Sequence, residues 1–143
     1  MLIPKKSKYR KPQKGKIKGK SQKGNYVAFG EFGLQSLQSF WITNQQIESC
    51  RVTINRKLRR GGKLWIRIFP QIQITKKPAE TRMGKGKGSP DSWVAVIKPG
   101  RVIFEVGGVE SNVAKAALGM AAYKLPCKAR VIPRMDVGGE KAQ

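Results

Sequence analysis

The stretch I-T-N-Q-Q-I-E-S-C-R-V-T-I-N-R-K-L, residues 42–58, carries the clearest structural signal in the chain. Thr43 and Gln46 have the spacing of a capping box, in which each side chain bonds the other residue's backbone N–H. Ile42 and Ile47 stand where a hydrophobic staple would pack around that cap. The sequence therefore predicts a helix with Thr43 as its N-cap.

One face of this helix is predicted to be buried. Four apolar residues recur at helical spacing: Ile47, Cys50, Ile54 and Leu58. Because Cys50 lies on that stripe, we interpret it as a small core residue and not as a reactive thiol. Gly61 and Gly62 follow, and glycine is the residue that most often ends a helix, so we expect the helix to end there.

Cations crowd the C-terminal end of the same helix: Arg51, Arg56, Lys57, Arg59 and Arg60. One or two of them would be explained by attraction to the negative end of the helix dipole. Five are more than a cap needs. We therefore expect this end of the helix to contact phosphate groups.

The rest of the chain predicts mostly strands. Strands are expected over residues 26–33, 63–69, 71–75, 93–97, 101–106 and 127–132. Glycines in the first indicate a bulge or a close backbone contact, and the Lys98-Pro99-Gly100 turn predicts that 93–97 and 101–106 pair as a hairpin. A second helix is expected over 110–125, with four inward residues: Val113, Ala117, Met120 and Ala121. The predicted fold class is α+β, a mostly antiparallel sheet with two packed helices.

The net charge points to a polyanionic partner. The 143 residues carry 30 Lys and Arg against 8 Asp and Glu, a formal charge of +22. That much self-repulsion would destabilise an isolated compact domain, so nucleic acid is the first candidate partner. The predicted organisation is an extended basic arm (1–24), one domain (25–132) with a projecting basic loop (76–90), and a C-terminal tail (133–143). The arm has ten cations and no acid, and the alternative for it is a solvated tail that confers solubility.

The projecting loop contains P-A-E-T-R-M-G-K-G-K-G-S-P, residues 78–90. Its alternate glycines permit a close approach to another surface, and Arg82, Lys85 and Lys87 supply positive charge. A nucleotide-binding P-loop would need Ser or Thr after the lysine and a helix next. Here Gly88 follows Lys87 and a strand is predicted, so that interpretation fails.

Other functional classes find little support in the sequence. There is no histidine, the acids are scattered, and the two cysteines are far apart, so we expect no enzyme, no metal and no cofactor. No apolar run is long enough to span a membrane, and we find no lipidation signal. Without a DNA-reading motif, folded RNA is the favoured partner. The cation count alone also permits an RNA chaperone or a general RNA-binding module.

Several motifs together resemble the L-sixteen family of large-subunit ribosomal proteins. They are M-L-I-P-K at the start, W-I-T-N-Q-Q-I-E (41–48), R-R-G-G-K (59–63), W-I-R-I-F-P (65–70), the 78–90 loop and I-K-P-G (97–100). The resemblance implies a hammerhead-type α+β fold, binding to large-subunit rRNA beside neighbouring ribosomal proteins, and tRNA positioning at the A site, with the P site as second candidate. It is strongest to plastid members, so a plastid (chloroplast) ribosome is expected, with mitochondrial or bacterial ribosomes as alternatives.

Site residues carried over from this resemblance fall into two groups. The loop facing tRNA corresponds to Arg82, Met83, Gly84, Lys85, Gly86 and Lys87. The regions lying on rRNA correspond to Lys5, Lys6, Lys8, Arg10, Lys11, Lys14, Lys16 and Lys18 in the arm, and to Arg51, Arg56, Lys57, Arg59, Arg60 and Lys63 around the helix end.

Overall fold

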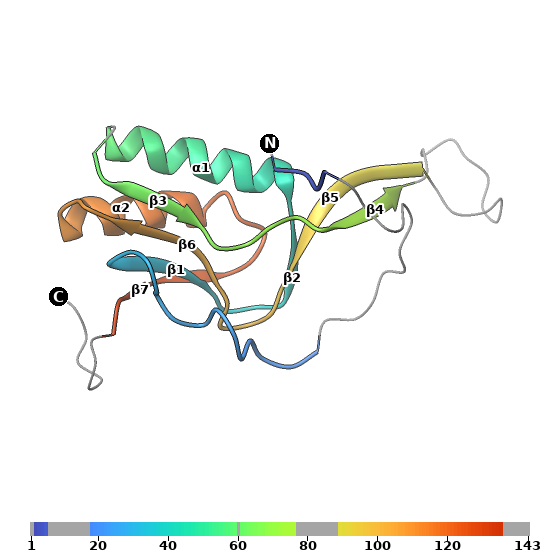
Figure 1. The fold of residues 1–143 in the computed structure, drawn as a ribbon, viewed down its shortest axis with the longest axis horizontal. Coiled ribbons are helices and arrows are strands. Elements are labelled where there is room, and N and C mark those ends of the chain that lie inside the picture. Colours follow the sequence, from blue (N-terminus) through green and yellow to red (C-terminus); the bar gives the residue numbers. More distant parts are fainter. Residues whose placement is uncertain (1, 6–17, 60, 77–88, 136–143) are drawn as a thin grey trace.

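The computed structural model describes residues 2–5, 18–59, 61–76 and 89–135 (Figure 1). Within them the chain has the predicted α+β fold, and every strand pair is antiparallel. The elements in order are β1 (Phe32–Ser36), β2 (Phe40–Thr43), α1 (Asn44–Leu58), β3 (Lys63–Ile66), β4 (Ile72–Lys76), β5 (Ser89–Ile97), β6 (Val102–Gly107), α2 (Ser111–Ala122) and β7 (Ala129–Pro133). Residues 6–17, Arg60, most of the predicted loop and residues 136–143 of the tail lie outside the described residues.

The strands of the described chain form two sheets, with orders β3-β6-β1-β7 and β2-β5-β4. The expected hairpin between residues 93–97 and 101–106 is therefore wrong, because β5 pairs with β2 and β4 whereas β6 pairs with β1 and β3. The Pro-Gly turn is present, with Gly100 at φ +95°. It carries the chain from one sheet to the other, since a local turn signal does not specify which strands pair across it.

The capping box that opens α1 is confirmed. The Gln46 N–H donates to Thr43 Oγ1 at 3.2 Å, and the Thr43 N–H donates to Gln46 Oε1 at 2.9 Å. The predicted stripe Ile47, Cys50, Ile54 and Leu58 is buried. The helix ends earlier than the glycine pair suggested: Leu58 is its last residue, and Arg59 takes the left-handed conformation (φ 50°) that closes it.

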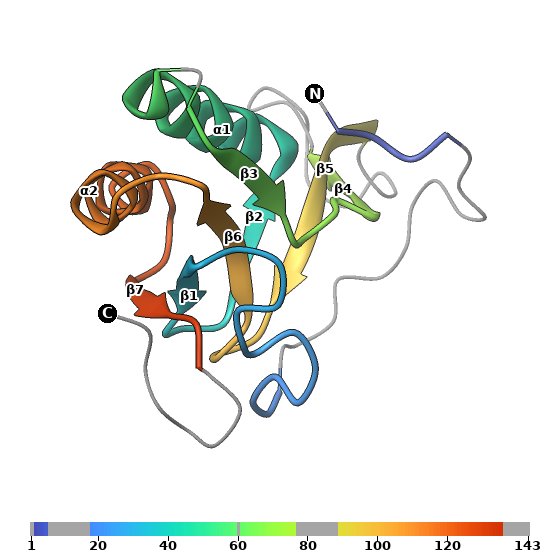
Figure 2. The same cartoon turned by 60° about the vertical axis from the view of Figure 1, so that its left-hand side comes forward.

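The core lies between the two helices and the four-stranded sheet. α1 and α2 lie side by side, and Figure 2 shows residues 18–31 on the opposite face of this sheet. Both faces of β1 and β6 are thereby covered, and every residue of these strands is buried. This explains their continuous burial, because a strand with one solvated face would alternate.

The strand expected over residues 26–33 is a second correction, since β1 begins only at Phe32. Residues 26–31 instead form an irregular segment on the sheet. The expected close backbone contact is confirmed at Gly30, where a Cβ would lie 2.7 Å from Val106 O. A side chain at Gly30 would push this segment off β6.

The inward face of α2 was predicted only in part. Ala117 and Ala121 are buried, but Met120 is 47% exposed and that prediction is wrong. Ala114 and Leu118 lie in the core instead. The Ala-rich sequence has few large residues to define a stripe, so its helical phase is weakly specified by the pattern.

A buried carboxylate fastens the 26–31 segment to the sheet. Glu105 on β6 is fully buried and accepts hydrogen bonds from the Ala28 N–H and, at 3.2 Å, the Phe29 N–H. Arg67 Nη1 donates to the same carboxylate at 3.0 Å, and its guanidinium lies 4.7 Å from the centre of the Phe29 ring. A buried charge is tolerated only when it is paired and hydrogen-bonded, and here three donors meet that condition.

We predict that Glu105→Gln lowers the free energy of unfolding by about 3–5 kcal/mol, because it leaves the largely buried Arg67 without its counter-charge. Glu31→Gln, an exposed carboxylate on the same segment, is the matched control and should change stability little. Urea unfolding of the full chain measures both. If the two variants have the same free energy of unfolding, the charge of Glu105 contributes nothing to the stability of the fold.

Candidate nucleic-acid interface

The fold pairs only a few of the described cations with protein groups. The described cations whose side chains contact a side chain or a backbone carbonyl are Arg51, Arg67, Arg101, Lys115 and Arg130. In the described part of the chain, ion pairs form only at Arg51–Glu48 and Arg67–Glu105. Most of the described cations therefore have no carboxylate partner within the described chain.

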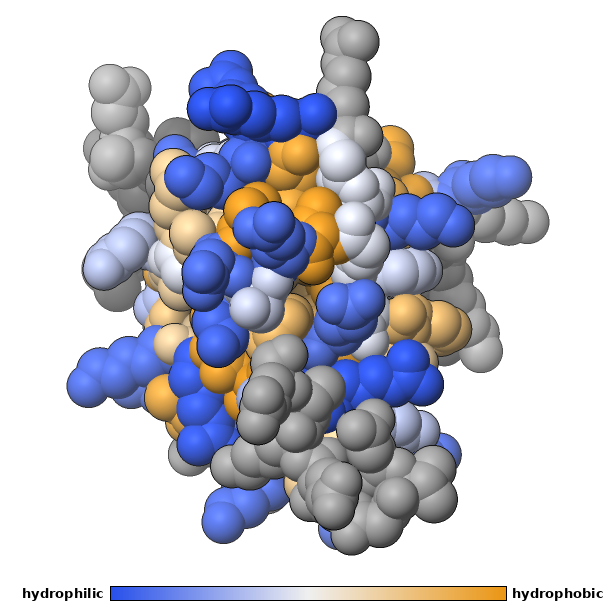
Figure 3. Space-filling model, turned by 90° about the vertical axis from the view of Figure 1, so that its left-hand side faces the viewer, coloured by the Kyte–Doolittle hydropathy of each residue, from blue (hydrophilic) through white to orange (hydrophobic). Residues whose placement is uncertain are grey.

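The C-terminal end of α1 gathers one group of free cations. Arg56 and Lys57 lie in its last turn, Arg59 is the C-cap and Lys63 begins β3, and all four side chains are exposed. Figure 3 looks at this end of the molecule and shows hydrophilic side chains gathered at its upper edge, where α1 ends. These predicted site residues are thus brought together. Arg60 lies outside the described residues.

Arg51 differs from the other predicted cations of α1. Its Nε donates to Glu48 Oε2 at 2.9 Å, and its Nη2 donates to the other carboxylate oxygen. This hydrogen bond lowers the pKa of Glu48 and raises that of Arg51. A phosphate would have to compete with Glu48 for Arg51, so this cation is less available than those of the last turn.

The end of the predicted arm is attached to the domain. The Ser21 N–H donates to Pro99 O at 2.9 Å, and the Val102 N–H donates to Gly24 O at 2.7 Å. Arg101 donates to Lys23 O and to Arg67 O, so it serves to hold this segment. Lys5 and Lys18, the predicted arm contacts that the structure describes, are exposed. The arm's attachment therefore occupies Arg101, which sequence reasoning had not singled out.

The predicted tRNA-facing loop joins two paired strands. β4 and β5 form a hairpin whose last described pair is Lys76 with Ser89. In Figure 1 this hairpin extends to the right, away from both helices. Arg82, Met83, Gly84, Lys85, Gly86 and Lys87 lie outside the described residues, and the structure fixes only the two ends of their loop.

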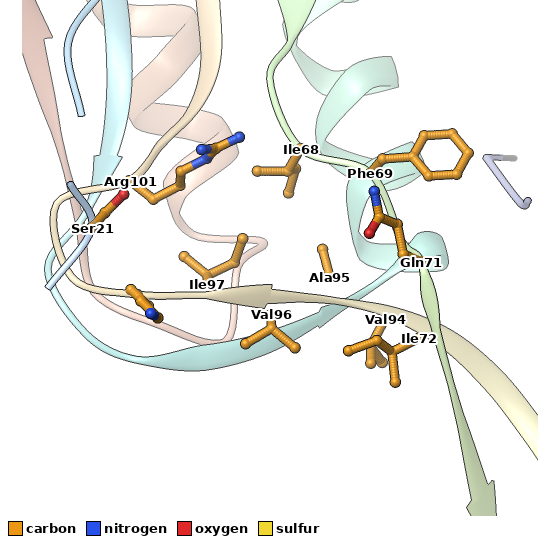
Figure 4. Close-up of a pocket in the computed structure, with 11 residues that line it drawn as sticks. Ser21, Ile68, Phe69, Gln71, Ile72, Val94, Ala95, Val96, Ile97 and Arg101 are labelled. Carbon is orange, nitrogen blue, oxygen red and sulfur yellow. The ribbon is translucent and has the colours of Figure 1, made fainter. Parts of the chain in front are cut away.

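A hollow of about 310 Å³ lies beside β5 (Figure 4). Arg101 and Ser21 stand at one end, Phe69 and Gln71 at the other, and aliphatic side chains lie between them. Arg101 is already bonded to backbone carbonyls, and the described lining residues include no acid. Its charged lining side chains are Arg101 and Lys98, so the acid–base pair that a carboxylate or histidine would form is absent from the described lining.

The described residues offer no cluster of three or more metal-ligating side chains. Both cysteines are buried, as expected for Cys50, and burial raises the pKa of the Cys50 thiol to about 11. A thiol with that pKa is almost entirely protonated at neutral pH and a poor nucleophile. Neither described helix has the length and apolar character to cross a bilayer.

Comparison with known proteins gives one consistent result. The family described as Ribosomal protein L16p/L10e matches residues 4–132. A protein of Heliobacterium modesticaldum named Large ribosomal subunit protein uL16 is 57% identical over 140 residues, which cover 98% of this chain and 97% of that protein. A Leptospira biflexa protein of the same name is 60% identical over 134 residues, covering 94% of this chain and 98% of its own length.

Proposed function

The chain belongs to the Ribosomal protein L16p/L10e family, and from this we propose that it binds large-subunit rRNA through its unpaired surface cations and helps to position tRNA. As a member of this family it is a structural constituent of the large ribosomal subunit and not an enzyme. Its partners are accordingly rRNA and neighbouring ribosomal proteins. The further proposals concern which residues make these contacts.

One observation supports the rRNA proposal above the others: the cations of the α1 end are exposed and close together in the fold. In the described chain, Arg56, Lys57, Arg59 and Lys63 have no side-chain counter-ion. Such a group is suited to phosphate contacts, which dominate protein–nucleic acid affinity and make it depend on salt. The predicted arm contacts, Lys5 to Lys18, would add further phosphate contacts.

The tRNA proposal concerns the loop that follows β4. Arg82, Lys85 and Lys87 carry its charge, and Gly84 and Gly86 allow close approach to an RNA backbone. The β4–β5 hairpin supports the proposal, because a paired base would let the loop reach away from the rRNA-bound domain. We assign the A site as its place of action and the P site as the second candidate.

For location, we propose a plastid ribosome, on the wording of motifs such as W-I-T at Trp41 and R-R-G-G-K at Arg59. Bacterial ribosomes are the second candidate, favoured by the bacterial origin of the two relatives described above. In either location the chain would be part of a large ribosomal subunit.

The α1 interface is tested by Lys57→Gln, with Lys115→Gln as the matched control. Both are exposed helical lysines, but the Lys115 ammonium already lies 5.5 Å from the centre of the Phe32 ring. In a plot of log affinity for large-subunit rRNA against log salt concentration, Lys57→Gln should reduce the slope by about 1, the value for one lost phosphate contact. The control should leave the slope unchanged, and equal slopes for the two variants would contradict a contact at Lys57.

The loop proposal is tested by Arg82→Ala in reconstituted ribosomes. Assembly of the large subunit should persist, while the rate of elongation falls several-fold because tRNA loses a contact. Arg82→Lys, which keeps the charge, should retain more of the rate. The contrary outcome is a low yield of assembled Arg82→Ala subunits together with a normal elongation rate in the subunits that do form. That result would make the loop an assembly element.

A further inference from the structure

Gln35 is held by the fold in a single orientation. Its Nε2 donates to Gly100 O at 3.0 Å and to Asn25 O at 3.3 Å. Only the amide nitrogen can donate to two carbonyls, so the remaining atom of the group, Oε1, must be the acceptor. That acceptor receives the Nε–H of Arg130 at 3.0 Å.

The sheet register explains how Gln35 and Arg130 meet. Gln35 of β1 stands directly opposite Arg130 of β7. On its other side β1 shifts register with β6 between Leu34 and Gln35. Such an irregularity changes the direction of the side chain beside it, and here Gln35 contacts both Gly100 of the 98–100 turn and Asn25, the residue after the arm.

The free edge of the Arg130 guanidinium is exposed. Among the described residues, Nη1 and Nη2 have no hydrogen-bond or ion-pair partner, and Arg130 is solvent-exposed. A guanidinium recognises phosphate through two parallel N–H donors in a fixed plane. Because Gln35 holds the Nε side, the ordering of this flexible side chain is partly complete before a ligand arrives.

The surroundings of this edge are suited to an anion. A hollow of about 320 Å³ is lined by Arg130, Lys20, Ser21 and the backbone of Gly100, among others. None of the described residues that line it carries a carboxylate. Lys20 belongs to the attached arm, so the arm brings a second cation to the hollow.

The hollow lies away from the α1 end. In both Figure 1 and Figure 2, α1 runs along the upper side of the molecule and the turn between β5 and β6 lies at the lower side. Gly100 of this turn lines the hollow. Arg130 therefore belongs to a different surface from Arg56, Lys57 and Arg59.

We propose that Arg130, positioned by Gln35 and assisted by Lys20, binds a backbone phosphate of large-subunit rRNA at a second site on the domain. This rests on the proposed function, since it takes rRNA as the partner. It adds an anchor from β7, so that rRNA contacts both the α1 side and the opposite side of the fold.

The test compares Arg130→Lys with Arg134→Lys in the full chain. Both changes keep the charge, but only the first removes a guanidinium held by Gln35; Arg134 is exposed on the segment just after β7. Arg130→Lys should lower the affinity for large-subunit rRNA about tenfold, the effect of one charge-assisted hydrogen bond. Arg134→Lys should not change it, and the salt slope should stay the same for both.

A second comparison tests the positioning role. Gln35→Met should weaken rRNA binding in the wild-type chain but have no further effect once Arg130 is lysine. Urea unfolding of each variant verifies that it is folded under the binding conditions. If Gln35→Met does not fold, the comparison of the two arginine variants decides alone.

An NMR experiment separates rRNA from free anion. The Arg130 Nε–Hε signal should shift on adding an equimolar large-subunit rRNA fragment that the protein binds, and not on adding equimolar inorganic phosphate. A shift with inorganic phosphate would overturn the assignment to rRNA in favour of a free-anion site. If Arg130→Lys binds rRNA as tightly as the wild-type chain, this inference is wrong and the proposed function is unaffected. If the wild-type chain itself does not bind rRNA, the proposed function is wrong as well.

Discussion

The Glu105 carboxylate is the constraint on which the arrangement of the other charges depends. It is fully buried, and a charge in that position must be paired. Its hydrogen-bond donors are the backbone N–H groups of residues 28–29 and the guanidinium of Arg67, which follows β3 in the chain. Pairing therefore draws residues 18–31 over the face of the sheet opposite the helices, which completes the burial of β1 and β6.

The covering segment in turn determines which cations remain free. It occupies Arg101, whose guanidinium bonds Lys23 O and Arg67 O, and it supplies Asn25 O, which orients Gln35. With only 8 acids against 30 Lys and Arg, few cations can find a carboxylate within the chain. The exposed group at the end of α1 is a consequence of that imbalance, and a ribosomal RNA supplies the opposite charge in quantity.

Local signals in the sequence predicted local structure well. The capping box at Thr43 and the stripe through Ile54 each depend on residues a few positions apart, and both are confirmed. The Pro-Gly turn was found, but its strands were paired wrongly because sheet membership depends on distant partners. Met120 was placed inward because an Ala-rich helix defines its buried face poorly.

In the candidate interface, too, features that are local in sequence were predicted and contacts between distant residues were not. The cations of the α1 end are neighbours in sequence and were predicted as a group. The contact between Gln35 and Arg130 joins residues 95 positions apart, and no spacing rule connects them. Arg67 likewise was not singled out from the sequence, whereas the fold uses it to neutralise Glu105.

If the cations that the fold leaves unpaired meet RNA phosphates, the most direct measurement is a chemical footprint of large-subunit rRNA in subunits with and without this chain. Backbone protections should be confined to a few defined segments, and at least two separate segments should respond to the presence of the protein. Protections spread evenly along the rRNA, or identical patterns with and without the chain, would contradict a specific rRNA interface.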